Sequence, residues 1–303
     1  MAWTVADCPD QEGRTALITG ANSGLGLETA RALSARGARV VLACRSLERA
    51  EQARTELQAE GSGELIALEL DLADLESVRR GADQLADQLG TLDLLINNAG
   101  VMAPPRRLSA QGHELQFAVN HLGHFALTQQ LLPLLEPQGR VVHVSSGAAY
   151  FGRIGFDDLQ GARRYDAWAA YAQSKLANLI TALELQERLQ AAGSTVRSIA
   201  AHPGLARTNL QPTSVAARGS RLEGWAYRLM DPMFQSAAMG ALPQLYAATA
   251  TEVELNTFYG PGGLGNFKGY PKACRMAPAA LDPTTRQRLW QVSEELTGNA
   301  LGT

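Results

Sequence analysis

Three residues in the sequence could together move a proton. Tyr171 and Lys175 stand four residues apart in the run YAQSK, which places a phenol and an ammonium on one face of a helix. A free phenol has a pKa of about 10, but a neighbouring cation stabilises the phenolate and lowers that pKa towards neutral pH. Ser146 ends an expected strand and could hold a substrate oxygen. The pattern predicts proton transfer, and the alternative is an ordinary surface pair.

A glycine-rich turn predicts a dinucleotide site. Residues 19–26 read TGANSGLG and join the first expected strand to the first expected helix. Glycines at such a turn let the backbone bend sharply and bring main-chain N–H groups close to a pyrophosphate. The spacing GxxxGxG departs from the GxGxxG of the standard fingerprint, so a turn without a ligand is the alternative.

The next two strand ends bear on which dinucleotide binds. The second expected strand, 39–43, is followed by Cys44 and Arg45, where a reader of the ribose 2′-hydroxyl would normally be Asp or Glu. Arg45 could instead pair with a 2′-phosphate, which favours NADP(H) over NAD(H), although a strand-end arginine can also be simply solvated. Asp71 and Leu72 follow the third strand. Asp71 could hydrogen-bond the adenine amino group or merely cap a helix.

Polar residues after the fourth strand also face this region. Residues 97–100 read NNAG, in which paired asparagines could bridge strand ends while small residues leave room for a cofactor; a simple turn is the alternative. Asn120 stands among apolar residues in mid-helix and needs a hydrogen-bonding reason, either structural or a held water. His121 and His124 lack a third ligand, so we expect no metal site.

The pattern around these residues predicts an α/β fold. Short apolar runs alternate with longer amphipathic stretches, which indicates a doubly wound parallel Rossmann sheet with helices on both faces. The expected strands are 15–19, 39–43, 65–70, 92–97, 140–145 and 195–201, and the expected helices are 24–36, 47–60, 74–88, 112–135 and 168–192. No linker divides the chain, so residues 1–303 are expected to form a single domain.

The pattern changes after Pro203. Residues 205–235 mix Gly, Pro and Arg with bulky apolar side chains and are expected to form a variable substrate flap. Those side chains could wall an apolar pocket, or they could simply be core. They are Trp225, Tyr227, Met230, Met233 and Phe234. A helix is expected at 237–249, a short strand at 257–259 and a last helix at 283–296, and segment 260–303 is expected to complete the pocket.

Composition excludes several classes of protein. The 303 residues carry 27 Lys and Arg against 30 Asp and Glu, so nothing in the charge favours nucleic acid or anionic lipid as a partner. An apolar fraction of 46% with 19% charged residues fits a folded globule. We expect neither a membrane span nor a secretory signal. Three scattered cysteines suggest no disulfide framework, so a cytoplasmic location is expected.

Together, TGANSGLG, NNAG, Asn120, Ser146 and YAQSK resemble the short-chain dehydrogenase/reductase family, in the same order from about residue 13 to 208. The resemblance implies that Tyr171 is the acid/base, that Lys175 lowers its pKa and contacts the nicotinamide ribose, that Ser146 orients the carbonyl, and that Asn120 anchors a relay water. It also implies cofactor contacts along the chain. These are Gly20, Ser23, Gly24, Leu25, Gly26, Arg45, Asp71, Leu72, Asn98, Ala99, Gly100, Tyr171, Lys175, Pro203 and Thr208.

The subgroup is indicated by spacing. Ser146 and Tyr171 are 25 positions apart, more than in the commonest members, and the inserted segment is similar to that of retinol dehydrogenases and the WW-domain oxidoreductase. We therefore expect NADP(H)-dependent interconversion of a carbonyl and an alcohol on a bulky apolar small molecule, with a homodimer or homotetramer as the candidate assemblies. The alternatives are a catalytically silent protein that senses NADP(H), and C=C reduction or epimerisation on the same fold.

Overall fold

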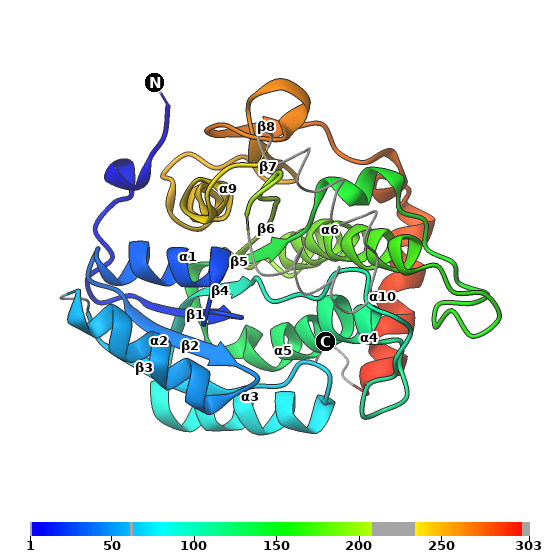
Figure 1. Ribbon diagram of the computed structural model, residues 1–303, viewed down its shortest axis with the longest axis horizontal. Coiled ribbons are helices and arrows are strands. Elements are labelled where there is room, and N and C mark those ends of the chain that lie inside the picture. Colours follow the sequence, from blue (N-terminus) through cyan, green and yellow to red (C-terminus); the bar gives the residue numbers. More distant parts are fainter. Residues whose placement is uncertain (1, 61–62, 208–233, 299–303) are drawn as a thin grey trace.

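The computed structural model describes residues 2–60, 63–207 and 234–298, and its centre is one β-sheet (Figure 1). Within those residues the strand order is β3-β2-β1-β4-β5-β6-β7-β8. The strands are β1 (Thr15–Thr19), β2 (Arg39–Cys44), β3 (Leu65–Glu69), β4 (Leu92–Asn97), β5 (Leu135–Val144), β6 (Arg197–Ala201), β7 (Phe258–Pro261) and β8 (Pro271–Cys274). Neighbours pair in parallel except β7 and β8, which pair antiparallel.

Helices cover both faces of the sheet. They are α1 (Gly24–Ser34), α2 (Leu47–Ala59), α3 (Leu75–Leu89), α4 (Leu115–Phe117), α5 (Gly123–Leu131), α6 (Ala167–Ala191), α9 (Ala237–Thr249) and α10 (Pro283–Thr297). Side chains of α1, α2 and α9 share one apolar core cluster with the sheet, and those of α3, α5 and α6 share another. All five residues of β1 are buried, as a strand covered on both faces requires. The predicted doubly wound Rossmann architecture is confirmed.

Two local expectations were wrong. The single helix expected over 112–135 is instead α4, one π-helical turn η2 (Ala118–Leu122), α5 and a 3-10 turn (Leu132–Leu134), after which β5 already begins. A π turn inserts one residue without interrupting the apolar sequence, so periodicity alone does not reveal it. The antiparallel edge strand β8 was also not expected, because its four residues are partly or fully exposed and show no apolar run.

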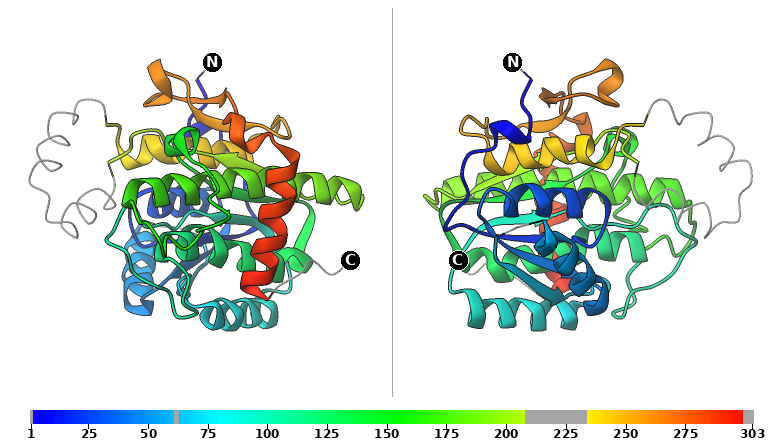
Figure 2. Two further views of the ribbon diagram at one scale, coloured as in Figure 1. Left: turned by 90° about the vertical axis from the view of Figure 1, so that its right-hand side faces the viewer. Right: turned by 60° about the vertical axis from the view of Figure 1, so that its left-hand side comes forward.

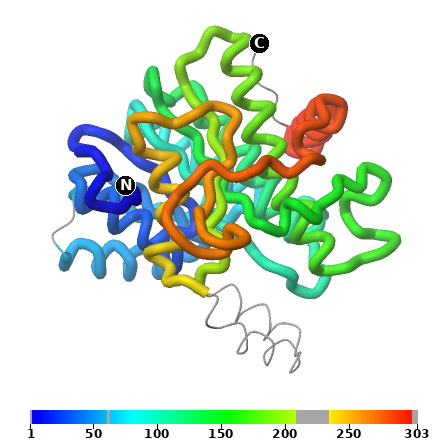
Figure 3. The backbone as a smooth tube through the Cα atoms, turned by 90° about the horizontal axis from the view of Figure 1, so that it is seen from above, coloured from blue at the N-terminus to red at the C-terminus, as the bar shows by residue number. Residues whose placement is uncertain are grey.

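The last helix packs against α6, and the segment before α6 extends away from the body of the protein. Helix α10 crosses α6 in Figure 2, where an ion pair between Arg286 and Glu187 (2.8 Å) and the stacking of Arg188 on Trp290 join the two helices. Between the 3-10 turn η4 (Gly147–Phe151) and α6, residues 152–166 stand out from the body on the side away from α2 (Figure 3). This is the segment that lengthens the spacing between Ser146 and Tyr171.

Candidate active site

The order of the strands reverses between β1 and β4, so their carboxyl ends open a crevice where ligands of such sheets bind. The glycine turn leaves β1 at this point and NNAG leaves β4. The backbone of Gly20 has φ of +68°, which only glycine adopts readily. A Cβ built on Gly26 would lie 2.3 Å from the carbonyl oxygen of Gly20 and 2.7 Å from Nδ2 of Asn98. These two motifs are therefore in direct contact.

Asn98 bridges strand ends, as paired asparagines were expected to do. Its Nδ2 donates to the carbonyl oxygen of Thr19 (2.8 Å), and its Oδ1 accepts from Nε2 of Gln244 (3.2 Å). The Thr19 hydroxyl accepts from the backbone N–H groups of Asn98 (2.9 Å) and Ala99 (3.0 Å). Gln244 on α9 also donates to Thr29 on α1 (2.6 Å). Thr19 and Gln244 support the site and were not singled out from the sequence.

Asn120 uses its whole side-chain amide to join two segments. Its Oδ1 accepts from the N–H of Val101 (2.8 Å), while its Nδ2 donates to the carbonyl oxygen of Val101 (2.9 Å) and to the hydroxyl of Ser174 (2.8 Å). It is fully buried and lies in the π turn η2. The question left open by the sequence is answered in part: the side chain has a structural partner set.

The main-chain carbonyl of Asn120 is bound by a histidine. The ring Nδ1 of His124 lies 3.0 Å from the Asn120 carbonyl oxygen, and Nε2 lies 2.8 Å from the Thr19 hydroxyl. A carbonyl only accepts, so Nδ1 carries the hydrogen and Nε2 accepts from Thr19. Burial lowers the pKa of His124 to about 4, so the ring is neutral near pH 7. Among the described residues, no group of His, Cys, Asp or Glu could hold a metal ion.

Lys175 is buried beside the end of NNAG. It is 4% exposed, and its Nζ donates to the carbonyl oxygen of Val144 (3.1 Å) at the end of β5. A Cβ built on Gly100 would lie 3.4 Å from Nζ and 3.2 Å from Oδ1 of Asn120. Nζ is also 6.0 Å from the ring centroid of Tyr171, which is itself buried. Burial lowers the pKa of Lys175 to about 8.

The two serines after β5 have different surroundings. Ser145 is buried, and its hydroxyl donates to the carbonyl oxygen of Lys175 (2.6 Å), which ties β5 to the middle of α6. Ser146 is partly exposed and accepts from the N–H of Ala148 (3.2 Å) at the start of η4. The hydroxyl hydrogen of Ser146 therefore has no acceptor among the described residues and can be donated to a substrate oxygen.

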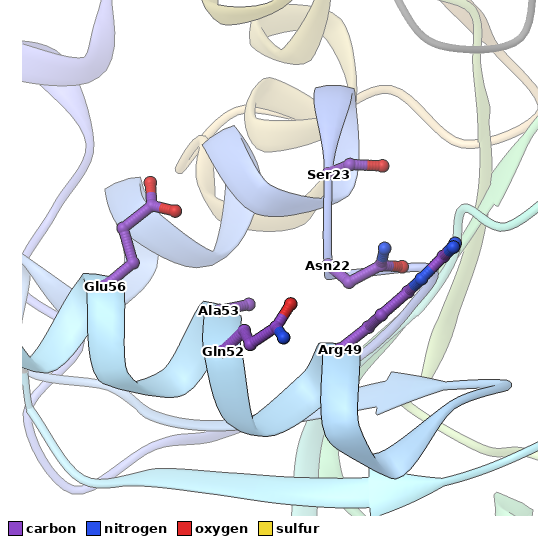
Figure 4. A pocket seen from close by; sticks show the side chains of 6 residues that line it. All are labelled: Asn22, Ser23, Arg49, Gln52, Ala53 and Glu56. Carbon is purple, nitrogen blue, oxygen red and sulfur yellow. The ribbon is translucent and has the colours of Figure 1, made fainter.

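Two arginines lie at the far end of the glycine turn. Arg45 is exposed, and no described residue forms an ion pair or hydrogen bond with its guanidinium; the same holds for Arg49 on α2. Arg49 lines a hollow of about 360 Å³ together with Asn22 and Ser23, and Figure 4 shows its side chain extended alongside Asn22. The Ser23 hydroxyl makes no capping bond at the start of α1. Sequence reasoning missed Arg49, which the run RSLER placed one helical turn beyond Arg45.

The remaining expected contacts are placed as follows. Asp71 forms a local turn with the N–H of Ala73 (2.9 Å), and the cap of α3 is Asp74, so Asp71 is no helix cap. Leu72 is buried against Gly123 of α5, whose added Cβ would lie 2.5 Å from the Leu72 carbonyl oxygen. Pro203 precedes the base of the expected flap. Thr208 and the flap residues 208–233 lie outside the described residues.

The base of the flap is held by short bonds. Residues 206 and 235 form an isolated parallel bridge, and the side chain of Gln235 donates to the carbonyl oxygen of Pro203 (2.8 Å). The N–H of Leu205 donates to the carbonyl oxygen of Phe267 (2.7 Å) in the loop between β7 and β8. Part of the expected segment 260–303 therefore lies at the flap base, whereas α10 packs against α6.

No helix among residues 2–60, 63–207 and 234–298 has the length and apolar character needed to cross a bilayer.

Comparisons with known proteins bear on the family and the fold of the chain. The short chain dehydrogenase family profile matches residues 14–219. Human retinol dehydrogenase 14 is 40% identical, with 94% of this chain and 87% of that relative covered. A crystal structure of an uncharacterized protein from Mycobacterium paratuberculosis is 43% identical with a TM-score of 0.84 over 100% of both chains. The complex of Pseudomonas aeruginosa RhlG with NADP is 26% identical with a TM-score of 0.65, covering 82% of this chain and 94% of that one.

The matched region contains the glycine turn, NNAG, Asn120, Ser146 and the YAQSK helix whose contacts are described above. A profile match over more than half of the chain and 40% identity over nearly all of it agree with the motifs and with the Rossmann fold. The chain therefore belongs to the short-chain dehydrogenase/reductase family of NAD(P)-dependent oxidoreductases.

Proposed function

We propose that the protein interconverts a carbonyl group (of an aldehyde or ketone) and an alcohol on a bulky apolar small molecule. NADP(H) is the preferred cofactor, and Tyr171 is the acid/base. The observation that carries this proposal is the burial of the Lys175 ammonium between the end of β5, Gly100 and the ring of Tyr171. An ammonium is costly to bury. Stabilisation of a nearby phenolate by this charge would explain why the ammonium is buried at this position.

The proton is handled at the phenolic oxygen of Tyr171. At pH 7 a lysine with a pKa of about 8 is still mostly protonated, so Lys175 supplies a positive charge one helical turn from the phenol. That charge favours the phenolate and lets Tyr171 exchange a proton with a substrate oxygen near neutral pH. Ser146 donates a hydrogen bond to the same oxygen. Asn120 keeps the loop after β4 and α6 together, and the family resemblance gives it the further role of anchoring a relay water.

The glycine turn and its surroundings fit a dinucleotide phosphate. Gly26 has no room for a Cβ, so no side chain at this position covers the turn, and the Ser23 hydroxyl is available to a phosphate oxygen. Arg45 and Arg49 carry two guanidiniums with no described partner, which suits a 2′-phosphate and supports NADP(H); NAD(H) would bind without that contact. The nicotinamide supplies the hydride that is exchanged with the carbonyl carbon.

A bulky apolar substrate is inferred from the sequence of the flap and from the relatives. The chain is 40% identical to proteins named retinol dehydrogenases, and retinol is an apolar alcohol. We take residues 1–303 as one domain, with 205–235 as the substrate flap and 260–303 as the segment that completes the pocket; the bond between Leu205 and Phe267 supports the latter. Three unpaired cysteines support the cytoplasmic assignment, and a homodimer or homotetramer remains a prediction.

Replacement of Tyr171 by Phe tests the proposal. NADPH oxidation is followed by absorbance with a panel of aldehydes, ketones and quinones, and with NADH in parallel. We expect Tyr171→Phe to lower turnover by at least 10²-fold while the Kd for NADPH changes less than threefold, because the hydroxyl is the only group removed. Unchanged turnover in Tyr171→Phe would refute the assignment. NADPH binding without turnover of any panel member by the unaltered protein would favour the silent sensor.

A further inference from the structure

Gln116 lies one helical turn before Asn120 and, like Asn120, hydrogen-bonds both the loop after β4 and the segment around α6. We propose that Gln116 and Tyr165 are positioning residues that fix the width of the substrate site, because they clamp the loop after β4 (residues 101–104) to the start of α6. This inference rests on the proposed function, since it concerns which substrates that site accepts.

The Gln116 amide uses all of its hydrogen-bonding groups. It is 0% exposed. Its Oε1 accepts from the N–H of Ala103 (2.8 Å), and its Nε2 donates to the hydroxyl of Tyr165 (2.9 Å) and to the carbonyl oxygen of Ala167 (2.9 Å). The orientation of the amide is unambiguous, because the N–H of Ala103 only donates and the carbonyl of Ala167 only accepts. One side chain therefore binds both segments.

The two amides bracket the proposed acid/base. Asn120 joins Val101 to Ser174, three residues after Tyr171, and Gln116 joins Ala103 to Ala167, four residues before it. Both amides take a backbone group of the same loop on one side and a group of α6 on the other. Without Gln116, the loop after Gly100 and the first turn of α6 would lose the side chain that binds both Ala103 and Ala167. The distance between them at the outer end would then be held less tightly.

Tyr165 extends the clamp to the segment that lengthens the spacing between Ser146 and Tyr171. Its hydroxyl lies 3.1 Å from the carbonyl oxygen of Pro104 and 3.2 Å from Oε1 of the buried Glu114, so it donates to one of these two acceptors while it accepts from Gln116. Arg106 donates to the carbonyl oxygen of Gln160 (3.2 Å) in the same segment. The longer segment between Ser146 and Tyr171 thus supplies the phenol of Tyr165, which hydrogen-bonds the loop after β4.

The backbone of Ala103 shows that the loop is constrained. Ala103 has φ of +44° and is 0% exposed, a left-handed conformation that costs a residue with a Cβ of order 1 kcal/mol or more. Such a conformation persists only where the surroundings hold it, and the bond from its N–H to Gln116 is one that does. Trp168, one residue after Ala167, packs edge-on against Tyr171 with ring centroids 6.1 Å apart. The clamped ends therefore lie next to the site on both sides.

Replacement of Gln116 by Met removes the amide with little change in size, and Gln129→Met on α5 is the matched control because Gln129 is also buried. The kcat/KM is measured with NADPH for a graded series of aldehydes from hexanal to 2-naphthaldehyde. We expect the ratio between the best and the worst aldehyde to shrink at least fivefold in Gln116→Met and to stay within twofold in Gln129→Met. The Kd for NADPH should stay within twofold in both. A purely structural role would lower the active fraction for all substrates equally and leave the ratio unchanged, which would overturn the proposal.

Tyr165→Phe provides a milder variant should Gln116→Met fail to fold. The ratio of kcat/KM between the best and the worst aldehyde should shrink in this variant too. Amide hydrogen exchange gives a readout that needs no activity: peptides covering residues 101–104 and 165–169 should exchange at least tenfold faster in either variant than in Gln129→Met. Equal exchange would refute the clamp. Faster exchange together with no aldehyde turnover by the unaltered protein would support the clamp and refute the proposed function instead.

Discussion

Replacement of Lys175 by Met should stabilise the cofactor-free protein at neutral pH although it should destroy activity. Lys175 is 4% exposed, and burial lowers its pKa from 10.5 to about 8. Within the described residues no carboxylate forms an ion pair with Nζ, whose hydrogen-bond acceptor is the carbonyl oxygen of Val144. The buried ammonium therefore lowers the stability of the folded protein, because water would solvate the charge better. In the proposed reaction the same charge stabilises the phenolate of Tyr171.

The magnitude follows from the two pKa values. Because the folded pKa is lowered, the folded protein binds this proton less tightly than the unfolded chain does. Stability therefore falls as the pH drops from 10.5 to about 8, and the loss is constant below that. At about 1.4 kcal/mol per pKa unit, the loss at pH 7 is about 3 kcal/mol. Met removes the charge but also one hydrogen bond, worth about 1 kcal/mol. The Val144 oxygen keeps Asn178 as a donor at 3.3 Å.

We therefore expect Lys175→Met to unfold with a free energy about 2 kcal/mol above that of the unaltered protein at pH 7. The difference should shrink steadily between pH 8 and pH 10, where the unaltered protein no longer holds the charge. Urea unfolding without cofactor at pH 7, 8, 9 and 10 measures it. Lys272→Met, at an exposed lysine of β8, is the control and should show no such trend. A variant less stable than the unaltered protein at pH 7, or a difference independent of pH, would refute the reasoning.

Two further predictions concern the cofactor. Gly26→Ala should raise the Kd for NADPH more than tenfold, because its Cβ would lie 2.3 Å from the Gly20 carbonyl oxygen; fluorescence titration measures this, and Gly155→Ala, where the nearest atom is at 3.4 Å, should bind normally. Tight binding by Gly26→Ala would contradict the placement of the phosphate at this turn. Arg45→Ala should raise the KM for NADPH about tenfold and leave that for NADH unchanged, since one charge-assisted contact contributes about 1.5 to 3 kcal/mol. An equal effect on both cofactors would argue against a 2′-phosphate contact.

The fold was predictable because its signals are local. The strands β1, β2 and β4 are short buried apolar runs between helical stretches, and their order fixes the sheet. The π turn at Asn120 was not predictable, because apolar residues continue on both sides of it. The strand β8 was missed for a different reason. It is an exposed edge whose pairing with β7 depends on the loop between them rather than on its own four residues.

The candidate site was predictable only where residue type and spacing carry the chemistry. Tyr171 and Lys175 stand out as a phenol and an ammonium on one helix face. Gln116 and Gln244 do not, because a buried amide reveals its role only through its partners. Gln116 hydrogen-bonds Tyr165, which is 49 residues away in the sequence, and Gln244 hydrogen-bonds Thr29, which is 215 residues away. No local pattern encodes contacts at those separations, and the same holds for Arg49, whose neighbour Asn22 lies on another element.

Four supports of the site share one physical property, which is that they carry no charge near neutral pH. Asn98, Asn120 and Gln116 position backbone groups through amides that do not titrate, and burial holds the pKa of His124 at about 4. The charged group buried in their midst is Lys175, whose pKa lies near 8. These four groups therefore hold their hydrogen bonds in the same protonation state between pH 6 and 9. A change of rate in that range therefore does not come from ionisation of Asn98, Asn120, Gln116 or His124.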